Sequence, residues 1–117
     1  MRHFDRSSAE SQPIGTVDVR RWEQYGLNEL PFQAMWYTVP PGTSPAQDQH
    51  PELELSLVLS GTATVEAGGI VTEVPAGDSF LLGSEEAHII HNRSHDTPLV
   101  VFSAYWMPVE ATAEVAR

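Results

Sequence analysis

The sequence predicts an all-β domain, arranged as a sandwich or a barrel, on three observations. Short runs rich in apolar residues recur along the chain and leave little room for helix. Pieces rich in Gly, Pro, Ser and Asp separate these runs at close spacing. The chain has 117 residues, which is the size of one domain with one core.

The predicted elements follow one another in a simple order. Residues 1–13 are polar and unpatterned and end at Pro13, so we expect a flexible N-terminal arm. The β domain spans residues 14–108, and residues 109–117 form a C-terminal tail. Eight strands are expected inside the domain, at residues 16–22, 32–39, 54–61, 62–67, 70–74, 78–83, 87–92 and 98–106. The clearest turns between them are "PPGTSP", "AGG", "PAGD", "GSEE" and "NRSHDTP".

Composition narrows the classes of partner and site. Sixteen acidic against six basic residues give a formal charge of −10, which repels nucleic acid and anionic lipid. The absence of cysteine excludes disulfides and thiolate ligands, so any metal must be held by His and carboxylate. We find no apolar run of membrane-spanning length and no apolar core of a signal peptide near Met1, so we expect a cytoplasmic protein.

The stretch "DQHPELELSLVLSG" concentrates ionisable groups just before a run of leucines. In an extended chain Asp48, His50, Glu52 and Glu54 share one face, because side chains two apart on a strand point the same way. The opposite face carries Leu53, Leu55, Leu57 and Leu59, which form a large apolar patch if they point outward. We therefore expect a homodimer, unless "VDVRRW" or a second sheet covers the leucines within one chain.

The same stretch resembles the first motif of the cupin superfamily. That motif runs Gly, five residues, His, one residue, His, three or four residues, Glu, six residues, Gly. At the matching positions this chain has Gly42, Asp48, His50, Glu54 and Gly61. Asp48 therefore stands where the motif has its first His.

A second match lies further along the chain. The second cupin motif runs Gly, five residues, Pro, one residue, Gly, two residues, His, three residues, Asn. This chain has Gly77, Gly83, Glu85, His88 and Asn92 at those distances, so Gly replaces Pro and Glu replaces Gly. Both spacings are kept, and the resemblance extends over residues 36–107.

The resemblance implies a conical β-barrel of two antiparallel sheets, the double-stranded β-helix, with a divalent transition metal inside. The matching residues would make His50, Glu54 and His88 the metal ligands. Two imidazoles and a carboxylate leave coordination positions open for water or substrate and suit Fe, Mn, Zn or Ni. Bound cation would also neutralise carboxylates that are costly to bury. The alternative is a metal-free cupin in which these residues form a polar pocket floor.

The other polar residues of the site have open assignments. Asp48 is a fourth ligand, a general base beside the metal, or a solvated loop residue, and we assign it provisionally as the catalytic group. Glu52 is expected in solvent because Pro51 disturbs the alternation. His91 should point away from the cavity, since it alternates with His88.

Function is less narrowly predicted than fold, because one fold supports many chemistries. We expect an enzyme acting on a small organic molecule: an oxygenase with Fe, or an isomerase, cyclase or lyase with Zn, Mn or Ni. The alternative is a non-catalytic sensor or carrier, since this stretch also resembles the ligand-sensing cupin half of bacterial transcription regulators. A third hypothesis is a purely structural dimer, in which the predicted ligands would have no function.

Overall fold

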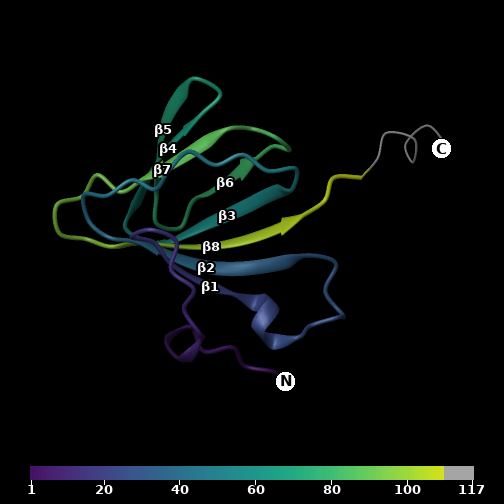
Figure 1. The fold of residues 1–117 in the computed structure, drawn as a ribbon. Helices are drawn as coiled ribbons and strands as arrows, with labels where there is room; N and C mark the ends of the chain where they lie inside the picture. The colour runs from purple at the N-terminus through teal and green to yellow at the C-terminus, as the bar shows by residue number, and fades with distance from the viewer. Residues whose placement is uncertain (110–117) are drawn as a thin grey trace.

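The structure, a computed structural model, describes residues 1–109 and consists of two antiparallel β-sheets that open toward one end (Figure 1). The larger sheet has the strand order β1-β2-β8-β3-β6 and the smaller one β5-β4-β7. The strands are β1 (Asp18–Arg21), β2 (Gln33–Val39), β3 (Leu53–Ser60), β4 (Thr62–Ala67), β5 (Ile70–Pro75), β6 (Ser79–Leu82), β7 (His88–His91) and β8 (Leu99–Trp106). Two short 3-10 helices, η1 (Arg6–Ser8) and η2 (Trp22–Tyr25), complete the described elements. The predicted all-β fold with two antiparallel sheets is confirmed.

The core lies between the two sheets and is made of alternate residues of the strands. Val39, Val58, Leu99 and Val101 are completely buried there, and Val65 and Ile90 reach them from the smaller sheet. Successive side chains of a strand point to opposite faces, so each strand contributes only every second residue to this core. The other face of each strand looks out of the barrel.

Residues 1–13, predicted as a flexible arm, lie against the outer face of the larger sheet. The centroids of the Phe4 and Trp22 rings are 4.9 Å apart. The Trp22 ring centroid lies in turn 5.4 Å from that of Trp36 and 5.5 Å from that of Phe102. Arg20 donates to the carbonyl oxygens of Arg6 and Ser7. The mobility of this segment stays a prediction, and the predicted C-terminal tail lies outside the described residues except for Val109.

Of the predicted leucine patch on the outer face of the larger sheet, Leu53 is half-buried and the other three leucines are exposed. Leu55, Leu57 and Leu59 of β3 are 46, 37 and 43% exposed, and Leu81, which pairs with Leu55 from β6, is 59% exposed. We call these four residues the leucine face. Neither β1 nor the smaller sheet covers it, so the predicted alternative of internal cover is wrong for the described part of the chain. Dimerisation itself stays a prediction.

Among the described residues, no helix has the length and apolar character needed to cross a membrane.

Candidate metal centre

The loop before β3 is tied by backbone hydrogen bonds to the start of β7 and to the turn before it. Asp48 and His88 exchange two N–H···O bonds of 2.9 Å each, which form an isolated antiparallel bridge. The N–H of Glu85 donates to the carbonyl oxygen of His50 at 2.7 Å. Because residues 48–52 are outside a strand, the alternation expected from Asp48 to Glu54 begins only in β3. The loop nevertheless carries Asp48 and His50 to the side of His88.

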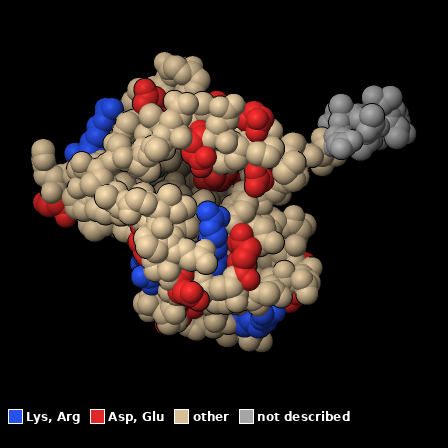
Figure 2. Space-filling view, viewed as in Figure 1, with Lys and Arg blue, Asp and Glu red and all other residues tan. Residues whose placement is uncertain are grey.

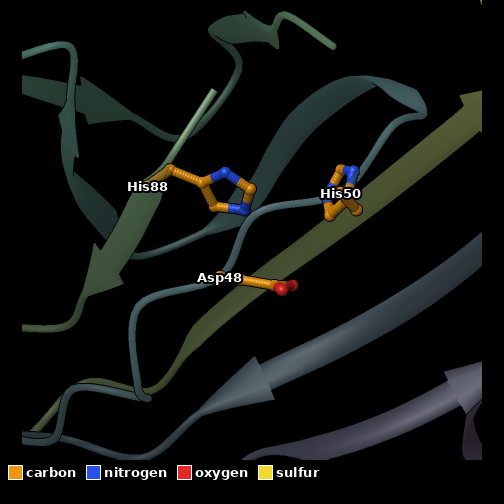
Figure 3. A group of neighbouring side chains, drawn as sticks. All are labelled: Asp48, His50 and His88. Carbon is orange, nitrogen blue, oxygen red and sulfur yellow. The ribbon is translucent and has the colours of Figure 1, made fainter. Parts of the chain in front are cut away.

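Figure 3 shows Asp48, His50 and His88 pointing toward a common space between this loop and β7. One ligand atom from each of the three residues lies within 4.8 Å of the other two. The imidazole rings of His50 and His88 have their centroids 5.2 Å apart. His88 is buried, His50 is half-buried and Asp48 is exposed, so the cluster joins the barrel interior to solvent.

Both imidazoles are oriented by backbone carbonyl groups. Nδ1 of His88 lies 2.8 Å from the carbonyl oxygen of Glu86, and Nδ1 of His50 lies 3.1 Å from that of Glu52. A carbonyl oxygen only accepts, so each Nδ1 carries the proton and donates it. Each Nε2 is then free to act as a metal ligand, the arrangement usual for metal-binding histidines.

Glu54 is the buried carboxylate of the site. Its Oε1 atom is 3.2 Å from Nε2 of His50. Its Oε2 atom is 3.2 Å from the hydroxyl oxygens of Ser56 and Ser103, which also lie 2.7 Å from each other. The two serines are paired residues of β3 and β8 and are completely buried. Glu54 is thus held from one side and faces His50 with the other.

The donor set fits a divalent transition metal. Two atoms that bind one metal at about 2.1 Å lie about 3 Å apart in an octahedral shell, close to the separation of His50 Nε2 and Glu54 Oε1. A buried carboxylate is also costly without a cation or several hydrogen bonds. The four donors of Asp48, His50, Glu54 and His88 are hard or borderline ligands suited to Mn, Fe, Ni or Zn.

A cavity of about 770 Å³ extends from this cluster into the barrel, and its lining includes Asp48, Glu54 and His88. Its walls are mainly apolar, with contributions from Ile14, Val17, Val19, Met35, Val39 and Ile90. A smaller hollow of about 230 Å³ adjoins it and includes His50, Glu52, Arg21 and Tyr105. Figure 2 shows this face of the molecule hollowed, with basic atoms inside the hollow and acidic atoms on both sides. The volume suits a small organic molecule.

Two tyrosines near the site keep their protons. Burial, and secondarily the charge of Glu54, raises the pKa of Tyr37 well above its usual range. Its hydroxyl has no hydrogen bond of good geometry, although those of Ser103 and Ser56 lie near enough to lower the pKa partly. Burial and a hydrogen bond to Glu23 raise the pKa of Tyr105 to about 12. Both residues therefore stay neutral, with the Tyr37 hydroxyl buried and the Tyr105 hydroxyl hydrogen-bonded to Glu23.

The other predicted polar residues lie outside the cluster. Glu52 is at the rim, with its carboxylate 3.9 Å from His50 Nδ1. His91 points to the outer side of the smaller sheet, where Nε2 lies 3.0 Å from Glu66 Oε2 and Nδ1 lies 2.6 Å from Ser44 Oγ. The assignments of His50, Glu54 and His88 as ligands and of Asp48 as the catalytic group stay predictions. The fold brings Asp48, His50 and His88 into one cluster, and it places Glu54 outside that cluster, next to His50.

The sequence analysis missed Arg21, Tyr37 and Tyr105. The alternation of β1 contained a usable signal, because Val17, Val19 and Arg21 share one face and the valines identify it as the inward one. An arginine on an apolar inward face is unusual and indicates a cavity. No comparable signal distinguishes Tyr37 and Tyr105 from aromatic core residues.

Comparison with known families agrees with this geometry. The family model for the cupin domain (Cupin_2) matches residues 35–105. This chain is a cupin. Its fold is similar to that of a Cupin 2 conserved barrel domain protein from Salinispora arenicola, with 22% identity, 96% of this chain and 89% of that chain covered, and a TM-score of 0.76.

Two further solved structures share the cupin fold. A predicted oxalate decarboxylase from Thermotoga maritima has 20% identity and a TM-score of 0.74, with 89% of this chain and 97% of that chain covered. The cupin domain of an XRE family transcriptional regulator from Enterobacter cloacae has 16% identity and a TM-score of 0.69, with 80% of this chain and 99% of that chain covered. At these identities the likeness concerns the fold alone.

Proposed function

We propose that this cupin is a metal-dependent enzyme that acts on a small organic molecule. The observation that carries the proposal is the cluster of Asp48, His50 and His88, with the carboxylate of Glu54 beside His50, next to a largely apolar cavity. Each imidazole is bonded to a backbone carbonyl group through Nδ1, which leaves Nε2 as the ligand atom, and the carboxylate of Glu54 is held by serine hydroxyls. Such a constellation is built for a cation that still has room for substrate.

His50, Glu54 and His88 would hold the metal, and Asp48 stands beside them. When bound, Fe would supply one-electron chemistry with oxygen, whereas Zn, Mn or Ni would supply Lewis acidity for an isomerase, cyclase or lyase. The apolar walls exclude water from the substrate. Asp48 is exposed and accepts only the N–H of Gln49 at 2.8 Å among the described hydrogen bonds, so its carboxylate can take or return a proton.

A binding function is the second candidate. The cupin domain of the Enterobacter cloacae transcriptional regulator shares this fold, and the predicted oxalate decarboxylase shares it equally. A sensor or carrier needs the cavity and tolerates a bound metal, but it does not need Asp48 to exchange protons. The effect of changing Asp48 therefore distinguishes an enzyme from a sensor or carrier.

Metal content tests the site directly. We expect purified protein reconstituted with Mn, Fe, Ni or Zn to bind one equivalent, and we expect His50→Ala, Glu54→Ala and His88→Ala each to lose most of it. His91→Ala is the matched control, because His91 lies on the outer side of the smaller sheet. Metal should raise the melting temperature of wild type, since a ligand at a hundredfold excess over Kd stabilises the native state by about 2.7 kcal/mol.

The metal content and the turnover of the Asp48→Asn variant decide the role of Asp48. Loss of metal comparable to that of His50→Ala would make Asp48 a fourth ligand. Retained metal with lost turnover would make it a proton carrier and support the enzyme. If the three Ala variants keep both metal content and melting temperature, the metal proposal is wrong and the cluster is a polar pocket floor.

A further inference from the structure

Arg21 lies on the inward face of β1, beside the proposed metal site. It alternates with Asp18 and Arg20, which face outward, and its register partner on β2 is Met35. Arg21 and Met35 both line the large cavity and the smaller hollow. The guanidinium group therefore belongs to the part of the cavity that the candidate ligands share.

The guanidinium of Arg21 is only partly occupied by hydrogen bonds. Its one described bond is from Nη1 to the hydroxyl oxygen of Tyr105, at 3.3 Å, and that hydroxyl donates in turn to Glu23. No carboxylate of the described residues forms an ion pair with Arg21 within 4.0 Å. An arginine has five N–H donors, so most of its donors have no partner in the described protein.

Arg20, the neighbour of Arg21, shows the contrast. Its Nε donates to Asp18 at 2.8 Å, and its Nη1 donates to the carbonyl oxygens of Arg6 and Ser7 at 2.7 and 3.2 Å. Arg20 thus joins the N-terminal segment to the sheet. Among the described residues, Arg21 has no ion pair and no bond to the N-terminal segment of this kind. Ion-pair partners are plentiful in this chain, which carries ten more negative than positive charges.

The charges around the cavity point to the class of ligand. Arg21 is the only Lys or Arg among the described lining residues, and it lines the smaller hollow together with Asp48, Glu52 and Glu54. A single guanidinium among carboxylates suits a monoanion, because a dianion such as a phosphate ester would meet more repulsion than one arginine can offset. A planar carboxylate also matches the bidentate geometry of guanidinium.

We propose that Arg21 binds a carboxylate group of the substrate while the apolar remainder of that molecule lies in the cavity. The inference deepens the proposed function and rests on it for the role of the metal, but the contact with Arg21 is independent of the metal. Tyr105 is a positioning residue, since its hydroxyl accepts from the guanidinium and orients it toward the hollow.

The test compares acids with their neutral amides. Phenylacetate, 3-phenylpropionate and 4-phenylbutyrate, each paired with its amide, are titrated into wild type, Arg21→Gln and Arg93→Gln by calorimetry, with metal and after chelation. Arg93 is exposed and lines neither hollow, so its change alters net charge equally. We expect wild type to prefer at least one acid over its amide by about tenfold or more, with and without metal.

The variants decide the outcome. We expect Arg21→Gln to reduce the preference for the acid to within about threefold and Arg93→Gln to retain it. An unchanged preference in Arg21→Gln, a preference that vanishes on chelation, or none in wild type up to millimolar concentrations would overturn the inference. Tighter binding of phenyl phosphate than of phenylacetate would overturn the choice of a carboxylate. If none of the His50→Ala, Glu54→Ala and His88→Ala variants loses metal, the proposed metal site is rejected. The comparison of acids with amides would still test the contact with Arg21.

Discussion

Glu85 occupies a backbone conformation that normally belongs to glycine. Its φ is 61°, and it is the one non-glycine residue of the described chain with a positive φ. It stands where the second cupin motif has Gly, so this departure from the motif carries a conformational cost of about 1–2 kcal/mol. The backbone N–H of Glu85 meanwhile holds the carbonyl oxygen of His50, which keeps the loop of the site in place.

Glu85→Gly should therefore raise the free energy of unfolding by up to about 1 kcal/mol, after the added freedom of the unfolded chain is subtracted. Urea unfolding measures this change. Glu86→Gly is the control with the opposite sign, because it removes the carboxylate that accepts the N–H of Gly83 at 2.9 Å. A lower stability for Glu85→Gly than for wild type would show that its side chain contributes more than its conformation costs.

The connection between β3 and β4 depends on a close backbone approach at Gly61. Its φ is 81°, and a Cβ atom there would lie 2.6 Å from the carbonyl oxygen of Pro98. This is the point where the chain passes from the larger sheet to the smaller one, next to the start of β8. The last glycine of the first motif is thus required by packing between elements as well as by its own conformation.

Gly61→Ala should destabilise the protein by about 1–3 kcal/mol more than Gly77→Ala. Gly77 has a similar φ of 94°, but a Cβ atom there would meet nothing within 4 Å, so the comparison isolates the steric clash. Thermal and urea unfolding of the two variants give the difference. Equal losses would mean that the backbone near Pro98 shifts without cost.

The strands were predictable because each is a short apolar-rich run between turn residues, and the two motif spacings identified the barrel. The expected strand begins only at residue 54, in agreement with β3, but the alternation of Asp48, His50 and Glu52 is equally consistent with an extended strand, and only Pro51 argued for the loop that residues 48–52 form. The 3-10 helix η2 was also missed, because its four residues are too few to show a helical period; Trp22 was assigned to the preceding strand, and Gly26 ends the helix with a φ of 63°. Arg21 was overlooked although its place on the same face as the buried Val17 and Val19 was a usable signal of a cavity.

At the scale of the whole molecule, the leucine face is the main unexplained surface. Its four side chains lie together on β3 and β6, while the aromatic half of the same outer face is covered by the N-terminal segment. Exposed apolar surface of this kind marks an interaction site. A second copy of the chain, packed leucine face to leucine face, is the occupant we propose.

Light scattering should give twice the chain mass of 12.9 kDa for wild type, and Leu57→Lys should shift the protein toward monomer by placing an unpaired charge in the interface. Val71→Lys is the matched control, because Val71 is 51% exposed on β5 in the smaller sheet. A monomeric wild type, or equal behaviour of the two variants, would contradict the dimer.

The position of β8 has a consequence for synthesis. It is the last strand of the described residues 1–109 yet lies in the middle of the larger sheet, between β2 and β3. Until residues 99–106 have been synthesised, β2 and β3 each lack the partner strand β8 on one edge, and their apolar faces stay exposed. Folding should be slow for a domain of this size, because its central pairings join distant parts of the chain. Truncation before Leu99 would remove β8 and leave β2 and β3 each with an unpaired strand edge, the template on which β-rich chains aggregate.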